Sequence, residues 1–263
     1  MSSQAWTRPR LIPNATVRAA IIGGVLLYLV LAIGSLEINW ARIALGFEKG
    51  WRLLLAFMNP NFSARWGEIV TGMRESLTMT VCATVAGVAL SIPIGIGAAR
   101  NLVHPAIYYI CRGIVAVSRS LQEIIVAILF VAMVGFGPFA GFLTITFATI
   151  GFLAKLLAED IEDIDGAQVE AIAAAGGSWL QRLEYAVRPQ VMPRLIGLCL
   201  YRLDINFRES AVVGIVGAGG IGATLNTAID RYEFDVAAAI LAIIIVIVML
   251  AEYSSSYLRK RVQ

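Results

Sequence analysis

The segment AAAILAIIIVIVMLAEYSSSYL, residues 237–258, indicates the fold class of this chain. Its aliphatic run carries no charged side chain before Glu252. A helix of about 20 such residues crosses the ~30 Å hydrocarbon core of a bilayer. We therefore predict a membrane-spanning helix at about residues 236–257, followed by the basic end RKRVQ.

The remainder of the chain has the same apolar character. Hydrophobic residues make up 59% of its 263 residues and charged residues 15%, and the mean hydropathy is +0.78. A soluble domain has about 25% charged residues, so most of this apolar surface must face lipid or other membrane helices. We predict an all-α polytopic membrane protein with about six transmembrane helices. The other five are expected at about residues 17–36, 76–99, 107–134, 138–158 and 194–215.

Composition divides the chain into two parts. Residues 1–70 are expected to hold a polar tail, the first transmembrane helix and an interfacial segment with tryptophans at headgroup depth. Residues 71–260 are expected to form the main transmembrane domain, with a polar loop over 160–193. Six spans place both termini on one side, which the positive-inside rule assigns to the cytoplasm. The basic residues flanking the first and last spans are Arg8, Arg10, Arg18, Arg259, Lys260 and Arg261.

Charge and cysteine usage exclude several function classes. The net charge is only +3 and the basic residues form no single patch, so nucleic acid is not an expected partner. Cys82, Cys111 and Cys199 are far apart, without a CxxC pair, which indicates neither a zinc site nor a disulfide framework. His104 is the only histidine, so a histidine-based metal site would lack partners.

The glycine run GIVGAGGIG, residues 214–222, contains the pattern G-x-G-x-x-G of a dinucleotide-binding turn. That turn requires a preceding strand and a βαβ unit, whereas this run follows an expected membrane helix. We therefore interpret the glycines as residues that let a helix end, turn and pack closely against a neighbour. The glycines concerned are Gly217, Gly219, Gly220 and Gly222.

The polar loop ends in EAIAAAGGSWLQRLEYAVRPQVMP, residues 170–193. Two short helices separated by Gly176 and Gly177 fit this sequence, and Ser178 can cap the second helix. Pro189 closes the unit. On physical grounds alone, an amphipathic loop lying on the membrane surface is an alternative.

This loop resembles the EAA motif of ABC-importer permeases. Glu170, Ala171, Gly176 and Pro189 stand at the positions of that motif. The chain departs from the general consensus at Ile172, Ala186 and Arg188. The residues that the resemblance assigns to coupling with an ATPase are Glu170, Ala171, Ala174, Gly176, Gly177 and Pro189.

Over roughly residues 65–260 the chain resembles phosphonate importer permeases. The stretches that carry this resemblance are ALSIPIGIGAARNL, VGFGPFAG, Lys155-Leu156-Leu157, RPQVMPRLI, LYRLDINFRES and VVGIVGAGGIGATL. The resemblance implies a type I ABC importer (MetI-like) permease fold with cytoplasmic EAA coupling helices in an ABC permease transmembrane domain, residues 71–260. It also implies a multi-pass location in the bacterial plasma (inner) membrane.

The resemblance further implies a set of partners. Two copies of the chain would form a homodimeric pore, and each would dock on one cytoplasmic ATPase subunit. An extracytoplasmic binding protein would deliver phosphonate or a related phosphorus oxyanion such as phosphate or phosphite. The chain has no Walker A loop, so it is expected to be a non-catalytic permease subunit that binds no cofactor. ATP and magnesium would be bound by the partner ATPase.

Ionisable residues inside membrane helices are costly and face a cavity or a partner. Arg119 and Glu123 are expected on one face of the third span. Arg202, Asn206 and Glu209 are expected on one face of the fifth span. Arg208 can pair with Asp204 four residues before it. The candidates for a translocation pathway are therefore Arg119, Glu123, Arg202, Asn206, Arg208 and Glu209. Internal ion pairs that hold helices or protomers together are the alternative.

Three other functions are alternatives to compare with this one. A methionine or other amino-acid importer would use a similar small six-helix plan, but the LYRLDINFRES stretch matches the phosphonate family more closely. A secondary transporter would require internal repeats with broken helices, and the sequence shows no repeat. A soluble oxidoreductase is excluded by the hydropathy.

Overall fold

The computed structural model describes residues 14–36 and 39–262, and all its regular elements within these ranges are helices. The basic tail with Arg8 and Arg10, on which part of the topology prediction rests, lies outside the described residues. The chain forms two compact units, Met1–Leu54 and Leu55–Gln263, which are described separately.

The first unit contains α1 (Ala15–Gly34) and most of α2 (Trp40–Phe57). The side chain of Asn14 caps α1 by accepting a hydrogen bond from the backbone N–H of Thr16 at 3.3 Å. The described side chains of α1 are almost all exposed within the chain, although the helix is strongly apolar. A helix with this pattern is suited to lipid on every side.

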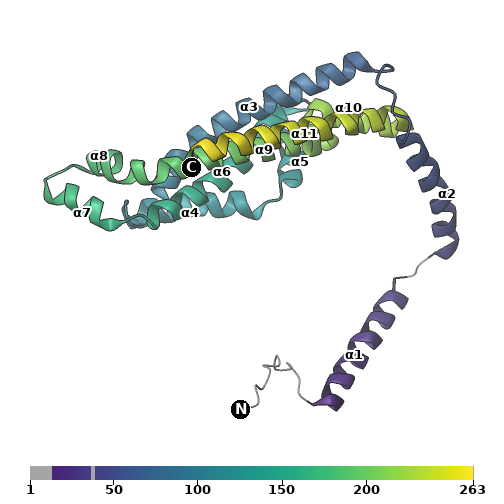
Figure 1. The fold of residues 1–263 in the computed structure, drawn as a ribbon, viewed down its shortest axis with the longest axis horizontal. Helices are drawn as coiled ribbons and strands as arrows, with labels where there is room; N and C mark the ends of the chain where they lie inside the picture. The colour runs from purple at the N-terminus through teal and green to yellow at the C-terminus, as the bar shows by residue number, and fades with distance from the viewer. Residues whose placement is uncertain (1–13, 37–38, 263) are drawn as a thin grey trace, which may run out of the picture. The chain divides into compact units, whose positions relative to one another are not determined.

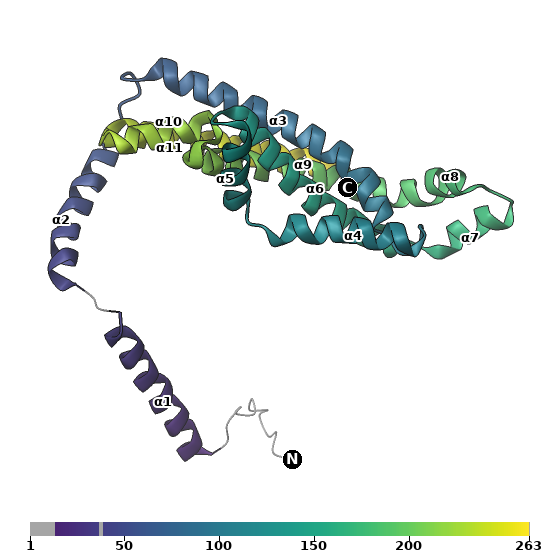
Figure 2. The same ribbon diagram turned by 180° about the vertical axis from the view of Figure 1, so that it is seen from behind.

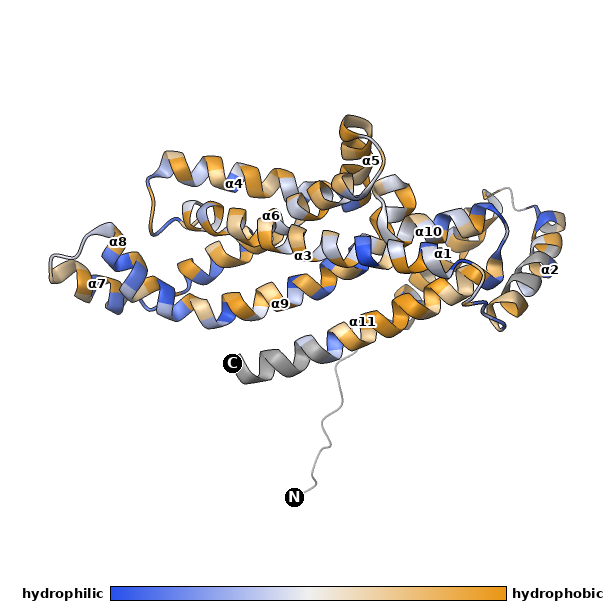
Figure 3. Ribbon diagram, turned by 90° about the horizontal axis from the view of Figure 1, so that it is seen from above, coloured by the Kyte–Doolittle hydropathy of each residue, from blue (hydrophilic) through white to orange (hydrophobic). Residues whose placement is uncertain are grey.

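The second unit is a bundle of long helices. Its first elements are α3 (Trp66–Gly97), α4 (Pro105–Ser120), α5 (Glu123–Val134) and α6 (Pro138–Glu162). They are followed by α7 (Gly166–Ala174), α8 (Trp179–Arg182), the π-helical turn Leu183–Val187, α9 (Arg188–Val213), the π-helical turn Gly214–Ala218, α10 (Gly220–Asp230) and α11 (Phe234–Val262). In both views α7 and α8 lie at one end of the bundle, with α10 toward the other (Figures 1 and 2). Figure 3 shows hydrophobic residues along much of α11 and many hydrophilic residues along α9.

Four described helices are long and apolar enough to cross a membrane, and two bent pairs raise the number to six if each pair is one span. This confirms the prediction of an all-helical protein with about six spans. The four single spans are Ala15–Gly34, Trp66–Gly97, Pro138–Glu162 and Phe234–Tyr253. The bent pairs are Pro105–Ser120 with Glu123–Val134, and Trp179–Ala218 with Gly220–Asp230.

The prediction of one continuous helix over 107–134 is wrong. The chain breaks at Leu121 and Gln122, whose backbones are extended, and α5 leaves the direction of α4 by 96°. Hydropathy does not reveal this break, because it carries no information on the direction of a helix. The bend is favoured because it allows Val126 and Ala127 to be buried. Arg119 and Glu123 therefore lie on two helices rather than on one face of a single helix.

Glycines let α3 and α6 run side by side at close range. A methyl group on Gly87 of α3 would lie 2.5 Å from Thr149 Cγ2 of α6, and one on Gly95 would lie 2.9 Å from Leu157 Cδ2. The contact moves from Thr149 to Leu157 along α6 as it moves from Gly87 to Gly95 along α3. The two helices therefore run in the same direction. Close approach through small residues is a common basis of helix packing in membranes, where lipid offers no hydrophobic force between helices.

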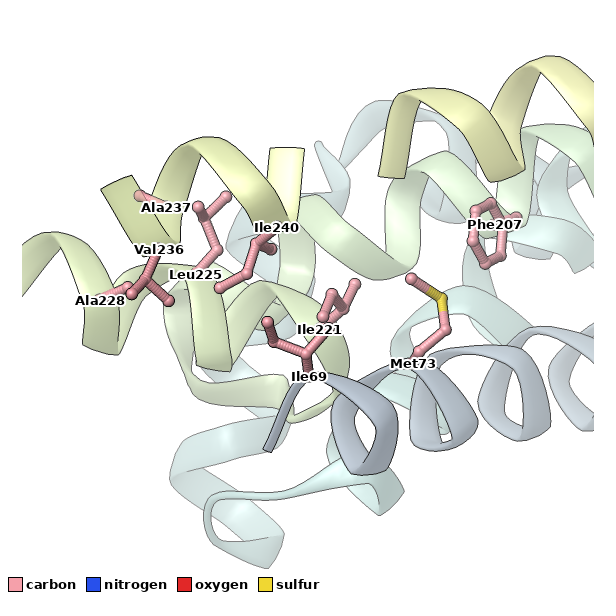
Figure 4. Packing of buried hydrophobic residues seen from close by; sticks show 9 residues of the cluster. All are labelled: Ile69, Met73, Phe207, Ile221, Leu225, Ala228, Val236, Ala237 and Ile240. Atoms are coloured by element: carbon pink, nitrogen blue, oxygen red, sulfur yellow. The ribbon is translucent and has the colours of Figure 1, made fainter. Parts of the chain in front are cut away.

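At the end of the bundle away from α7 and α8, a hydrophobic cluster joins α3 to α9, α10 and α11 (Figure 4). The glycine run contributes Ile221 to this cluster, and Gly217 and Gly219 within the run have φ values of 95° and 74°. These conformations are accessible to glycine at low cost and turn the chain from α9 into α10. The residues of the cluster are Ile69, Met73, Phe207, Ile221, Leu225, Ala228, Val236, Ala237 and Ile240.

Candidate functional site

The first candidate site is the helical hairpin of residues 166–187, formed by α7, α8 and the π-helical turn after it. The side chain of Asp165 caps α7 by accepting from the N–H of Ala167 at 3.0 Å. Gly176 then reverses the chain with a φ of 80°. Ser178 and Gln181 form a capping box at the start of α8. Local sequence signals thus specify both helices and the turn between them.

The hairpin exposes most of its surface. Neither α7 nor α8 contains a buried residue, and Leu180 and Tyr185 are each 68% exposed. Exposed apolar side chains on a projecting element are typical of a surface that binds another protein. The predicted coupling residues Glu170, Ala171, Ala174, Gly176 and Pro189 are exposed, and Gly177 is half-buried.

The base of the hairpin is tied to the bundle at two places. The indole Nε1 of Trp179 donates to the backbone oxygen of Leu102, in the turn after α3, at 2.8 Å. The side chain of Gln190, in the first turn of α9, accepts from the N–H of Asp165 at 3.0 Å. These two hydrogen bonds hold the hairpin against the turn after α3 and the first turn of α9.

A second group of contacts fixes the same turn to the end of α6. The guanidinium of Arg112 donates to Ala98 O at 2.8 Å and pairs with Glu162 at 2.9 Å. Glu162 also accepts from the backbone N–H of Arg100 at 2.8 Å. Because α6 leads directly into the hairpin, these bonds hold α3, α4 and α6 together at its base.

The second candidate site is a buried polar cluster around Arg202 of α9. Arg202 is 3% exposed, and its guanidinium pairs with Glu209 at 2.9 Å and with Glu123 of α5 at 3.5 Å. It also donates to Thr149 Oγ1 at 3.3 Å and lies 5.3 Å from the ring centroid of Phe152. One cation thus faces two carboxylates, a ring and a hydroxyl from three different helices.

Asn206 extends this cluster to a fourth helix. Its Nδ2 donates to Thr84 Oγ1 of α3 at 2.7 Å and to Thr149 Oγ1 of α6 at 3.0 Å. The cluster therefore joins α3, α5, α6 and α9 through hydrogen bonds at the centre of the bundle. Satisfied buried networks of this kind fix one arrangement of the helices.

The structure gathers four of the six residues predicted for a pathway, namely Arg202, Asn206, Glu209 and Glu123. Arg208 instead pairs with Asp204 at 2.7 Å on another side of α9. Arg119 is exposed on α4, with its guanidinium 5.9 Å from the ring centroid of Phe152. The sequence pattern does not reveal Thr84, Thr149 and Phe152 as members of the cluster, because their roles depend on contacts between helices. Hydroxyl residues in otherwise apolar helices are the only signal that could have marked the threonines.

No group of three or more metal-ligating side chains gathers within residues 14–36 and 39–262. The described residues thus combine lipid-exposed apolar helices, an internal polar cluster and a projecting hairpin tied to the spans. This combination is typical of a polytopic membrane protein that exposes a surface for another protein at one end of its bundle.

The chain belongs to the family of binding-protein-dependent transport system inner membrane components, whose sequence profile matches residues 91–263. Its fold is that of a type I ABC importer permease, and such a permease subunit is not itself catalytic. The fold agrees with a solved structure of the MetNI methionine ABC transporter, with a TM-score of 0.66 and 23% sequence identity. That match covers 76% of this chain and 99% of the transporter chain, and at this identity it shows the fold alone.

Two curated relatives share more sequence. The phosphate-import permease protein PhnE of Mycolicibacterium smegmatis is 46% identical over 203 residues, which are 77% of this chain. This chain spans only 38% of the length of that relative. The phosphite transport system permease protein PtxC of Stutzerimonas stutzeri is 36% identical over 244 residues, covering 92% of this chain and 88% of the relative.

Proposed function

We propose that this chain is the membrane permease of an ATP-driven importer for phosphonate or a related phosphorus oxyanion, phosphite or phosphate. The observation that carries the proposal is the exposed hairpin of residues 166–187, which is tied through Trp179 and Gln190 to the ends of α3 and α9. Such a surface gives an ATPase outside the membrane a mechanical connection to the spans.

The substrate class is supported by the relatives. The two relatives described above are named for phosphate import and phosphite transport, at 46% and 36% identity. The methionine transporter shares the fold at only 23% identity, so a methionine or amino-acid importer is the weaker alternative. A secondary transporter is a further alternative, but it would leave the exposed hairpin without a partner.

The working assembly that we propose contains two copies of this chain, two cytoplasmic ATPase subunits and an extracytoplasmic substrate-binding protein. Each hairpin docks on one ATPase, which binds ATP and magnesium, while this chain binds no cofactor. Closure of the ATPase pair favours one arrangement of the docked hairpins over the other, and this differential binding shifts the membrane helices. Both termini and the hairpin lie on the cytoplasmic side in this arrangement.

Substitutions in the hairpin test the proposal. Glu170→Lys reverses a charge on the exposed face of α7, and Gly176→Asp adds a side chain where φ is 80°. Both variants are expected to reach the membrane at normal levels, lose co-purification with the ATPase and abolish uptake of phosphonate. Asp230→Lys is the matched control, because it makes the same charge change at the exposed last residue of α10. Normal uptake by a well-expressed Glu170→Lys variant would contradict the proposed role of the hairpin.

A further inference from the structure

An open groove of about 510 Å³ lies between the first half of α3 and the start of α6. Its α3 wall includes Thr71, Arg74 and Thr78, and its α6 wall includes Phe139 and Phe142. The three α3 residues follow one another at spacings of three and four, so they form one stripe along the helix. The groove therefore has one wall with a cation and hydroxyls and one aromatic wall.

Arg74 differs from the paired arginines of this chain. Its side chain is exposed, and within the described ranges it makes no ion pair or hydrogen bond. By contrast, carboxylates face the guanidinium groups of Arg65, Arg112, Arg188, Arg194, Arg202 and Arg208. The guanidinium of Arg74 keeps its donors available for a ligand.

The carboxylate of Glu75 lines the groove but forms a hydrogen bond with α10. Glu75 accepts a hydrogen bond from the backbone N–H of Gly220 at 3.1 Å, at the N-terminus of α10. The neighbouring Ser76 accepts from the N–H of Ile221 at 2.9 Å. The positive end of the α10 dipole therefore offsets the charge of Glu75, and the groove keeps the positive character of Arg74.

The groove lies toward the end of the bundle opposite the hairpin. Helix α3 has 32 residues, about 48 Å of helix, which exceeds the ~30 Å hydrocarbon core. Arg74 follows Trp66, the first residue of α3, by about 12 Å of helix. Figure 1 shows this beginning of α3 at the end away from α7 and α8. With the hairpin in the cytoplasm, Arg74 stands near the outer mouth of the permease.

We propose that Arg74 binds the oxyanion of a phosphorus substrate as it enters the permease, with Thr78 donating a second hydrogen bond. This inference rests on the proposed function. The planar donor fork of arginine matches two oxygens of a phosphonate or phosphate group. Thr71 already donates to Gly67 O at 2.8 Å, so it contributes a polar wall rather than a free donor. The aromatic wall of Phe139 and Phe142 fits the organic substituent of a phosphonate.

Uptake by the complete reconstituted transporter, at saturating binding protein, is the first test. Arg74→Gln is expected to lower the maximal uptake rate of methylphosphonate and inorganic phosphate about tenfold or more, the effect of losing one charged hydrogen bond. Arg74→Lys keeps the charge and is expected to recover part of the rate, and Thr78→Val is expected to have a smaller effect than Arg74→Gln. Arg231→Gln, an equal charge change in the turn after α10, is the matched control and is expected to behave as the parent.

The results separate the two proposals. Uptake of methionine alone by the parent protein would refute the proposed function. Uptake of a phosphorus oxyanion by the parent, with an equal rate in Arg74→Gln, would refute only the role of Arg74. A fall in Arg74→Gln with no recovery in Arg74→Lys, together with loss of complex assembly, would show a structural role and would also refute it.

Cys82 gives an independent test because it lines the same groove. In a Cys111→Ala/Cys199→Ala background, a membrane-impermeant maleimide added from outside is expected to modify Cys82 in intact cells. Cys82→Ser in the same background is the control for other labelling. An uptake-competent transporter in which Cys82 does not react would show that the groove is closed to water, and would overturn the inference.

Discussion

A substitution that removes the charge of Arg202 tests whether the buried polar cluster stabilises the fold. The variant Arg202→Met removes the guanidinium that lies over the Phe152 ring and keeps an unbranched apolar stem of the length that arginine has up to Nε. It leaves Glu209 and Glu123 without the cation that they share. The side chain of Glu209 is 16% exposed and that of Glu123 is 35% exposed. The loss of the cation therefore destabilises the carboxylate of Glu209 more than that of Glu123.

The expected cost follows from this burial. Removal of one partner from a buried ion pair costs about 3–5 kcal/mol, because the remaining charge is left uncompensated. The lost cation–π contact adds about 1 kcal/mol, and the new thioether packing offsets part of that. We expect the free energy of unfolding to fall by about 4 kcal/mol. In a unit of about this size, that fall corresponds to a Tm lower by roughly 8–16 °C.

Thermal unfolding of the purified protein in one detergent measures this effect. The double variant Arg202→Met/Glu209→Gln is expected to regain about half of the lost stability, because the most buried carboxylate is then neutral. Arg119→Met is the control, since Arg119 lies against the same Phe152 ring and makes no ion pair among the described residues. An Arg202→Met variant with unchanged Tm, or a double variant less stable than the single one, would refute the reasoning.

Three further predictions follow from the packing and the hairpin. Gly87→Val places methyl groups against Thr149, so we expect a loss of about 2 kcal/mol or more in unfolding free energy by thermal unfolding in detergent, and Gly87→Ala should cost less. Trp179→Phe removes the bond to Leu102 O, so we expect ATPase activity of the assembled transporter to persist while uptake per ATP falls; unchanged uptake per ATP would contradict the mechanical tie. Ser178→Ala removes the cap of α8, and we expect about 1 kcal/mol of local destabilisation, seen as faster hydrogen exchange of the hairpin with unchanged exchange in α3.

Hydropathy and local signals were sufficient for much of the fold. The run at 237–258 predicted α11, and the glycine pair with Ser178 predicted two short helices in the polar loop. The break at Leu121 and Gln122 could not be predicted in this way, because neither residue is a glycine or a proline. Its cause is the packing of α5 on the bundle, which depends on residues distant in the sequence.

The candidate sites were predictable only where one helix carries all the residues. The spacing of Arg202 and Glu209 indicated one face of α9, and the structure pairs them. The contribution of Thr149 depends on the register between α6 and α9, which no local pattern contains. Arg74 lies outside the second span that hydropathy predicts, about residues 76–99, whereas α3 begins at Trp66.

We propose that this chain imports a phosphorus oxyanion, driven by an ATPase docked at the hairpin. The most direct measurement is ATP hydrolysis by the reconstituted permease, ATPase and binding protein, with phosphonate, phosphite, phosphate and methionine titrated in turn. The proposed function predicts stimulation by one or more of the three phosphorus oxyanions and none by methionine. Stimulation by methionine alone would contradict it.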